Sequence, residues 1–115
     1  MKQFIILSLV LFLGIHPLFA QNDYYLQQAE RYQREAEYYQ RKAEGYRDEA
    51  AYYLKKAQSY QHEVEYYTKR GDIDKAKTYM RYVENEMDKS QTYLRYASQA
   101  DEKATQYLRW AAEAL

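Results

Sequence analysis

Residues 25–64 decide the fold and read YLQQAERYQREAEYYQRKAEGYRDEAAYYLKKAQSYQHEV. A tyrosine stands at every seventh position from Tyr25, and a small residue stands at every seventh position from Ala29. The two series are offset by three and four residues in alternation, which is the spacing of the a and d positions of a coiled coil. The stretch therefore predicts one long helix over about 23–69, with alanine at a and tyrosine at d.

The pattern stops at Arg70-Gly71-Asp72, which predicts a turn over 70–72. Glycine suits the left-handed residue after a helix end, and aspartate suits the N-cap of the next helix. A second heptad series follows and predicts a second helix over about 73–115. Its a column holds Ile73, Met80, Met87, Leu94, Asp101, Leu108 and Leu115. Its d column holds Ala76, Val83, Ser90, Ala97, Ala104 and Ala111.

Folding back at the turn predicts an all-α fold, a long antiparallel two-helix hairpin of the coiled-coil type within residues 21–115. The alanines of the first helix would face Met and Leu of the second, and the tyrosines would face Ala, Val and Ser, so that large meets small on both sides. Asp101 is the one acid in this contact line, or seam, and we expect it to pair with Lys42.

The first twenty residues read MKQFIILSLVLFLGIHPLFA and form a separate segment. A basic start at Lys2 is followed by an apolar run, a proline and a small residue at Ala20, which is typical of a secretory signal peptide over 1–20. The run is short for a membrane anchor, the alternative interpretation, and polar residues follow at once. The segment predicts a secreted or periplasmic protein cleaved after Ala20, without stable membrane insertion afterwards.

Ten aromatic residues fall outside the predicted seam, at c of the first helix and at g and c of the second. These positions lie on one side of the hairpin, and we call the set the aromatic flank. It predicts self-association into a helical bundle, because exposed aromatic patches mark interfaces. The alternatives are a platform for a glycan or a partner helix, and oxidative tyrosine cross-linking. The aromatic flank comprises Tyr24, Tyr38, Tyr52, Tyr66, Tyr79, Tyr82, Tyr93, Tyr96, Tyr107 and Trp110.

Composition argues against most other functions. The chain carries 17 basic and 17 acidic residues, so it has no bulk attraction to nucleic acid, and it has no cysteine for disulfides or thiolate chemistry. His62 is the one histidine after residue 20, which makes a metal site or a Ser-His-Asp arrangement implausible. We therefore expect a non-enzymatic structural or interaction protein without metal or cofactor.

The predicted tip, Arg70-Gly71-Asp72, is also the tripeptide that some integrins recognise, so an adhesion ligand is a further, weaker hypothesis. The stretch 70–83, RGDIDKAKTYMRYV, resembles the G-D-x-x-x-A turn of a tetratricopeptide repeat. The resemblance covers this turn alone. Glu63 and Val64 stand where that family has Leu-Gly, and the heptads run far past a 34-residue unit.

Overall fold

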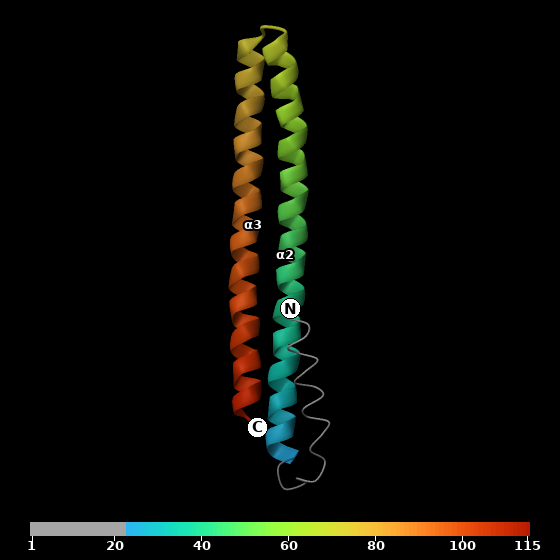
Figure 1. Ribbon diagram of the computed structural model, residues 1–115, viewed down its shortest axis with the longest axis vertical. Helices are drawn as coiled ribbons and strands as arrows, with labels where there is room; N and C mark the ends of the chain where they lie inside the picture. The colour runs from blue at the N-terminus through green and yellow to red at the C-terminus, as the bar shows by residue number, and fades with distance from the viewer. Residues whose placement is uncertain (1–22) are drawn as a thin grey trace. The chain divides into compact units, whose positions relative to one another are not determined.

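The computed structural model describes residues 23–115, which form two helices joined by a tight turn. Helix α2 spans Asp23–Lys69 and helix α3 spans Ile73–Glu113 (Figure 1). Within 23–115 there is no strand, and neither helix is long and apolar enough to cross a membrane. The signal peptide predicted over 1–20 lies outside the described residues.

The turn is built from the backbone of α2's last residues and the side chain of Asp72. Gly71 has a φ of 78°, the left-handed conformation that glycine adopts without strain. Its N–H donates to the Thr68 carbonyl at 3.1 Å, and the Asp72 N–H donates to the Tyr67 carbonyl at 2.9 Å, the paired bonds of a Schellman motif. Asp72 Oδ1 then accepts the Lys75 N–H at 3.2 Å, so Gly71 ends α2 and Asp72 caps α3.

The described chain divides into two compact units, and both helices contribute a segment to each. The first unit joins residues 23–41 of α2 to 100–115 of α3, and the second comprises 42–99 with the turn. In each unit the two helix segments lie side by side (Figure 1).

Ring contacts give the direction of the helices in each unit. In the second unit Tyr46 contacts Tyr93 and Tyr60 contacts Tyr79, so residue numbers fall along α3 as they rise along α2. The rings of the first unit pair in the same sense, Tyr32 with Trp110 and Tyr39 with Tyr107. Both units are therefore antiparallel helix pairs, and the predicted all-α antiparallel two-helix hairpin is confirmed.

The seam is made of small side chains from both helices. Ser90 shows how close the backbones come, because its Oγ donates to the Ala50 carbonyl across the seam at 2.8 Å. The buried residues of α2 include Ala29, Ala36, Ala43, Ala50 and Ala57. Those of α3 include Ala76, Val83, Ser90, Ala97, Ala104 and Ala111.

The large-on-small packing predicted for the a column of α3 is wrong along most of the second unit. Ile73, Met80, Met87 and Leu94 are exposed by 51, 48, 43 and 50 %, although Leu108 in the first unit is buried as expected. The physical reason is that α3 packs the small residues of its d column against the alanines of α2. The bulky a column then lies on one side of this contact line, and the g column, with Tyr79 and Tyr93, lies on the other.

Candidate functional site: the aromatic flank

The aromatic residues are gathered into three clusters of five rings, each inside one unit. Every cluster takes two d tyrosines and one c tyrosine from α2, and one g and one c residue from α3. Successive clusters are fourteen residues apart, or about 21 Å of helix. The Tyr39 cluster of the first unit holds Tyr32, Tyr38, Tyr39, Tyr107 and Trp110. The second unit holds the Tyr53 cluster, of Tyr46, Tyr52, Tyr53, Tyr93 and Tyr96, and the Tyr67 cluster, of Tyr60, Tyr66, Tyr67, Tyr79 and Tyr82.

The Tyr53 cluster shows the common geometry. Tyr53 and Tyr93 are stacked across the seam, with ring centroids 5.6 Å apart and planes inclined by 13°. Tyr46 completes the contact with Tyr93 at 6.2 Å and with Tyr96 at 5.5 Å. Tyr52 meets the edge of Tyr53 at 5.2 Å and 72°. Offset-stacked and edge-to-face pairs are the favourable arrangements for rings, so each cluster stabilises the helix pair.

The other two clusters repeat this geometry closely. Tyr39 stacks on Tyr107 at 5.7 Å and 10°, and Tyr67 stacks on Tyr79 at 5.5 Å and 14°. Trp110 takes the place that Tyr96 has in the Tyr53 cluster. The g residues of α3 were predicted to lie outside the seam, and this stacking shows that they help to close it.

A lysine of α3 lies over the central tyrosine of each cluster, four residues before the stacked partner on the same helix. The ammonium is within the range of a cation–π contact, which adds to ring stacking where the ring is partly shielded from water. The pairs are Lys75 over Tyr67 at 5.2 Å, Lys89 over Tyr53 at 5.5 Å and Lys103 over Tyr39 at 5.2 Å.

The clusters of the second unit hold two phenols in the protonated form. The pKa of Tyr79 is raised above its ordinary value, first by burial and then by the neighbouring Tyr67. The pKa of Tyr93 is also raised, first by the charge that Tyr53 would carry and then by burial. Both shifts favour the neutral phenol of these two residues over the charged form.

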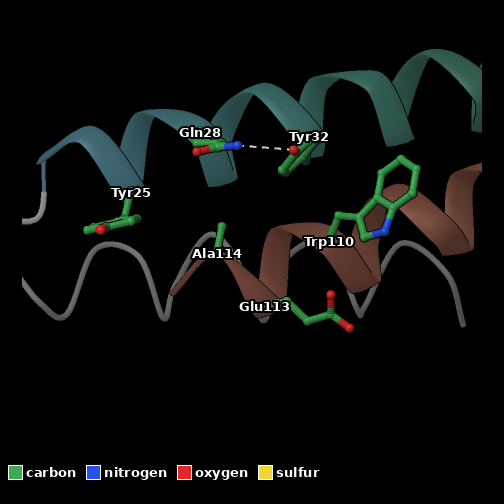
Figure 2. A pocket seen from close by; sticks show the side chains of 6 residues that line it. All are labelled: Tyr25, Gln28, Tyr32, Trp110, Glu113 and Ala114. Carbon is green, nitrogen blue, oxygen red and sulfur yellow. Dashed lines mark hydrogen bonds between the residues drawn. The ribbon is translucent and has the colours of Figure 1, made fainter.

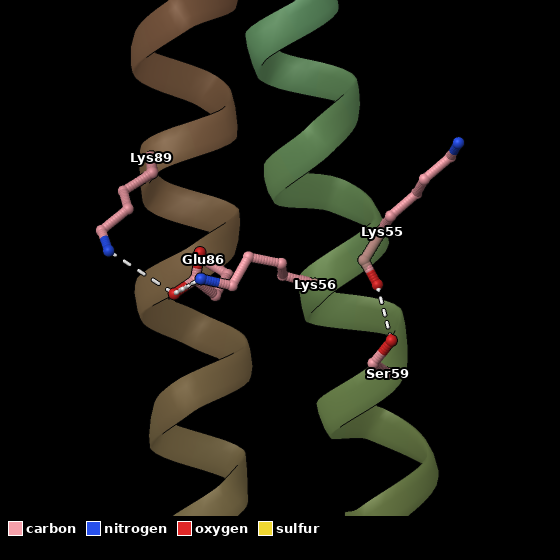
Figure 3. Close-up of polar contacts among 5 residues, drawn as sticks. All are labelled: Lys55, Lys56, Ser59, Glu86 and Lys89. Atoms are coloured by element: carbon pink, nitrogen blue, oxygen red, sulfur yellow. Dashed lines mark hydrogen bonds and ion pairs between the residues drawn. The ribbon is translucent and has the colours of Figure 1, made fainter.

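A buried carboxylate separates the two clusters of the second unit. Glu86 is 6 % exposed and lies in the same α3 column as Tyr79 and Tyr93. Its Oε1 lies 3.5 Å from Lys89 Nζ and 4.0 Å from Lys56 Nζ of α2 (Figure 3). Its other oxygen is buried without a hydrogen bond in the described chain. The charge is balanced, but its hydrogen-bonding capacity is only partly used.

The predicted flank residues differ in how much of each ring meets solvent. Tyr79, Tyr93 and Tyr107 are half-buried in the clusters. Tyr24 contacts Tyr25 edge-on at 5.5 Å, near the start of α2, and belongs to none of the three clusters. The exposed members are Tyr24, Tyr38, Tyr52, Tyr66, Tyr82, Tyr96 and Trp110, whose exposed fractions run from 41 to 69 %.

At the tip, two members of the Arg70-Gly71-Asp72 tripeptide are held by the hairpin itself. The Arg70 guanidinium lies 5.0 Å from the Tyr66 ring and donates a hydrogen bond to its hydroxyl. The Asp72 carboxylate is half-buried and caps α3. These contacts give the tripeptide a structural role, and its recognition by an adhesion receptor stays a prediction.

The predicted partners Lys42 and Asp101 belong to different units, Lys42 to the second and Asp101 to the first. Lys42 is exposed and Asp101 is half-buried. Their pairing stays a prediction.

The first unit also contains a hollow of about 390 Å³ (Figure 2). Its walls are aromatic, with two polar side chains at the edge. The Gln28 amide donates to the Tyr32 hydroxyl at 3.1 Å, and Trp110 lies 5.8 Å from the Tyr32 ring. The lining residues are Tyr25, Gln28, Tyr32, Trp110, Glu113 and Ala114.

Sequence reasoning missed that the d tyrosines belong to the same surface as the aromatic flank. It also missed the lysines that lie over them. The signal was present as a lysine four residues before an aromatic, repeated every fourteen residues at 75, 89 and 103. Glu86 was missed because its column, which also holds Tyr79 and Tyr93, was predicted to lie outside the seam.

Within 23–115 no group of three or more His, Asp or Glu side chains is placed to hold a metal ion. Comparison of the chain with protein-family models, curated proteins and solved structures gives no match. A functional proposal therefore depends on the geometry of the hairpin and on the sequence.

Proposed function

We propose that this chain is a secreted or periplasmic, non-enzymatic structural protein whose copies associate through the aromatic flank. The observation that carries the proposal is the thin core. Across 23–115 no large side chain is fully buried, while seven flank aromatics are exposed by 41 % or more. A hairpin only two helices thick buries too little apolar surface to be very stable alone, and association adds the missing burial.

The form of the clusters suits ring-on-ring contact between copies. Each cluster presents one c tyrosine of α2 and one c aromatic of α3 to solvent, as with Tyr52 and Tyr96. Rings of this kind supply large contact area at low entropic cost. Two hairpins that join their aromatic flanks would make a four-helix bundle with a second, aromatic seam.

The location and the lack of enzymatic activity are supported by the sequence. Residues 1–20 have the layout of a cleaved export signal, and a cysteine-free chain folds in any redox compartment. The carboxylates lie mainly on exposed faces among Lys and Arg, and convergent catalytic groups are not evident in the described helices.

The test is the light-scattering mass of the mature chain over a hundredfold concentration range, compared with a Tyr38→Ser/Tyr52→Ser/Tyr66→Ser variant. These three c tyrosines are exposed and take no part in the stacked pairs across the seam, so their loss leaves those pairs intact. Tyr52 also contacts Lys56 and Tyr66 contacts Arg70, both within α2 and the turn. The parent is expected to form a dimer or larger assembly, and the variant is expected to be smaller at the same concentration.

A matched control replaces exposed residues away from the flank, Gln58→Ser and Gln61→Ser, which should leave the mass of the parent unchanged. If the tyrosine variant keeps the full mass of the parent, association does not use the aromatic flank. A parent that stays monomeric throughout would contradict the proposal as a whole.

The hollow of the first unit favours one second candidate, a binding module for a glycan. Aromatic walls with an amide and a carboxylate at the edge suit a sugar ring, which stacks its C–H face and hydrogen-bonds its hydroxyls. Trp110 is the chain's one tryptophan, so its fluorescence reports directly on this hollow. Titration with soluble chitin and cellulose oligosaccharides should shift that fluorescence with saturation, and Glu113→Ala should weaken the response. A partner helix lying on the aromatic flank is the remaining alternative, and pull-down with the tyrosine variant as control would reveal it.

A further inference from the structure

A second exposed surface of the second unit is apolar and is not part of the aromatic flank. We call it the α3 stripe. It consists of Ile73, Met80, Met87 and Leu94, all exposed by 43 % or more. Met80, Met87 and Leu94 each directly follow a residue of the Tyr79–Glu86–Tyr93 column, so they lie about 100° around α3 from it.

Two residues of the stripe, Ile73 and Met80, border a groove. A hollow of about 750 Å³ is lined by Ile73 and Met80 of α3 and by Val64 and Thr68 of α2. Leu54 of α2 is exposed by 45 % on the same helix pair. Large apolar side chains above an unfilled groove are typical of a surface that another element covers.

We propose that a second copy of this chain covers the α3 stripe, with the two α3 helices antiparallel across a two-fold axis. The stripe is self-complementary about its midpoint between Met80 and Met87. In this arrangement Met80 faces the partner's Met87, and Ile73 faces the partner's Leu94. A two-fold interface requires this kind of self-complementary patch.

The charges that border the stripe select both the direction and the register. Each stripe residue is followed directly by a charged residue, and the sign alternates along the helix. Antiparallel pairing about this midpoint brings Arg81 within two residues, or about 3 Å of helix, of the level of the partner's Asp88. Asp74 and the partner's Arg95 are offset by the same amount, which long side chains can span. Parallel pairing, or a slip of one heptad, would place like charges together, which is destabilising. The border column is Asp74, Arg81, Asp88 and Arg95.

The area of this face fits a weak dimer. From Ile73 to Leu94 the stripe is about 32 Å long at the rise of an α-helix, and a hairpin is about 20 Å wide. The footprint is therefore about 600 Å² per copy, somewhat below the roughly 800 Å² that each partner contributes to a standard stable interface. Glu84 would also meet its own copy near the axis, which weakens the contact further. The face therefore predicts a dimer whose population depends on concentration.

The test uses charge reversal at Arg81 and Asp88 in the full mature chain that carries the Tyr38→Ser/Tyr52→Ser/Tyr66→Ser changes, so that association through the aromatic flank is weakened. Sedimentation equilibrium should show that Arg81→Asp alone, and Asp88→Arg alone, each weaken the dimer about tenfold. Mixing the two variants should restore the parent affinity, and so should both changes in one chain. The control Asp48→Arg reverses a charge on the outer face of α2 and should have no effect.

Disulfide trapping tests the register independently, because the chain has no cysteine of its own. A mixture of Met80→Cys and Met87→Cys chains should form the mixed disulfide faster than either chain forms its own. Faster self-coupling of Met80→Cys would show a parallel pairing or an antiparallel pairing in another register, and either would overturn the proposal. A charge series in which the mixture binds no better than the single variants would overturn it too, and would leave the aromatic-flank proposal untouched.

Discussion

The two sides of the second unit are built by the same two helices and reach opposite outcomes. On the side that carries the aromatic flank both helices contribute bulky side chains, so Tyr53 and Tyr93 stack on one another and Lys89 lies over the Tyr53 ring. On the other side only α3 contributes a regular row of bulk, and Met80 and Met87 stay exposed. The difference teaches that a bulky column packs when the facing column is also bulky, given a seam of alanines that holds the helices close.

The largest effect on stability is expected at the seam of small residues, because the packing on both sides of the second unit depends on it. Ala50→Leu would force a large side chain between the backbones at the point where Ser90 bonds the Ala50 carbonyl. We expect a loss of about 3 kcal/mol in the free energy of unfolding, from overpacking. Urea unfolding followed by circular dichroism measures it. Ala51→Leu, at the exposed neighbouring position, is the matched control and should change stability little.

A smaller effect is expected from breaking one side only. Tyr53→Ala removes the stacked partner of Tyr93 and should cost about 2 kcal/mol in the free energy of unfolding. Met87→Ala removes an exposed side chain from the other side and should cost less than about 0.5 kcal/mol. Thermal and urea unfolding of the two variants side by side give the comparison. Equal losses would mean that the half-buried, stacked Tyr53 contributes no more to stability than an exposed side chain does.

Alkaline pH should weaken the aromatic side selectively. The pKa values of Tyr79 and Tyr93 are raised above 10.0 in the folded chain, so the folded state holds these two protons more tightly than the unfolded chain does. This contribution to stability is fully present below pH 10.0 and is lost as the pH rises through the folded pKa values. Helicity and phenolate absorbance should be measured together from about pH 8 to about pH 12. Helicity should fall over the same pH range in which phenolate absorbance rises. Tyr93→Phe should show a shallower fall, and an unchanged fall would contradict the assignment.

A small effect is also expected at Glu86, the polar residue between the two clusters of the second unit. Glu86→Ala removes a buried carboxylate whose two lysine contacts are 3.5 and 4.0 Å long and whose second oxygen makes no hydrogen bond in the described chain. The lost ion pairs and the relieved desolvation nearly cancel, so stability should change by less than about 1 kcal/mol. Urea unfolding at low and high salt measures this. A loss above about 2 kcal/mol would show that the carboxylate is a main support of the helix pair.

Much of the fold was readable from spacing, because heptads are periodic and a turn has its own residue chemistry. Gly71 and Asp72 mark the helix ends by conformation and capping, which are local properties. The choice of which columns meet was not readable, since Met87 and Ser90 are equally plausible seam residues by period alone. That choice depends on how closely the backbones approach, which is a property of both helices together.

The candidate site was predictable in part for the same reason. The c and g aromatics stood out because they were left over after the seam was assigned. Their stacking on the d tyrosines depends on the rotation of α3 about its axis, and the heptad leaves that rotation open. The burial of Glu86 follows from the same rotation, which brings its column onto the seam between two tyrosines.

The fourteen-residue spacing of the clusters has a consequence for how this hairpin could change in length. The Tyr53 and Tyr67 clusters are related by fourteen residues forward in α2 and fourteen backward in α3. An insertion or deletion of fourteen residues in one helix alone would move every ring beyond it onto the equivalent ring of a neighbouring cluster. It would leave fourteen residues without a partner at the open end of the hairpin. Paired insertions at equal distances from Gly71 would instead add one whole cluster and leave the others in register. Viable length variants of this hairpin should therefore differ by matched blocks on both sides of the turn.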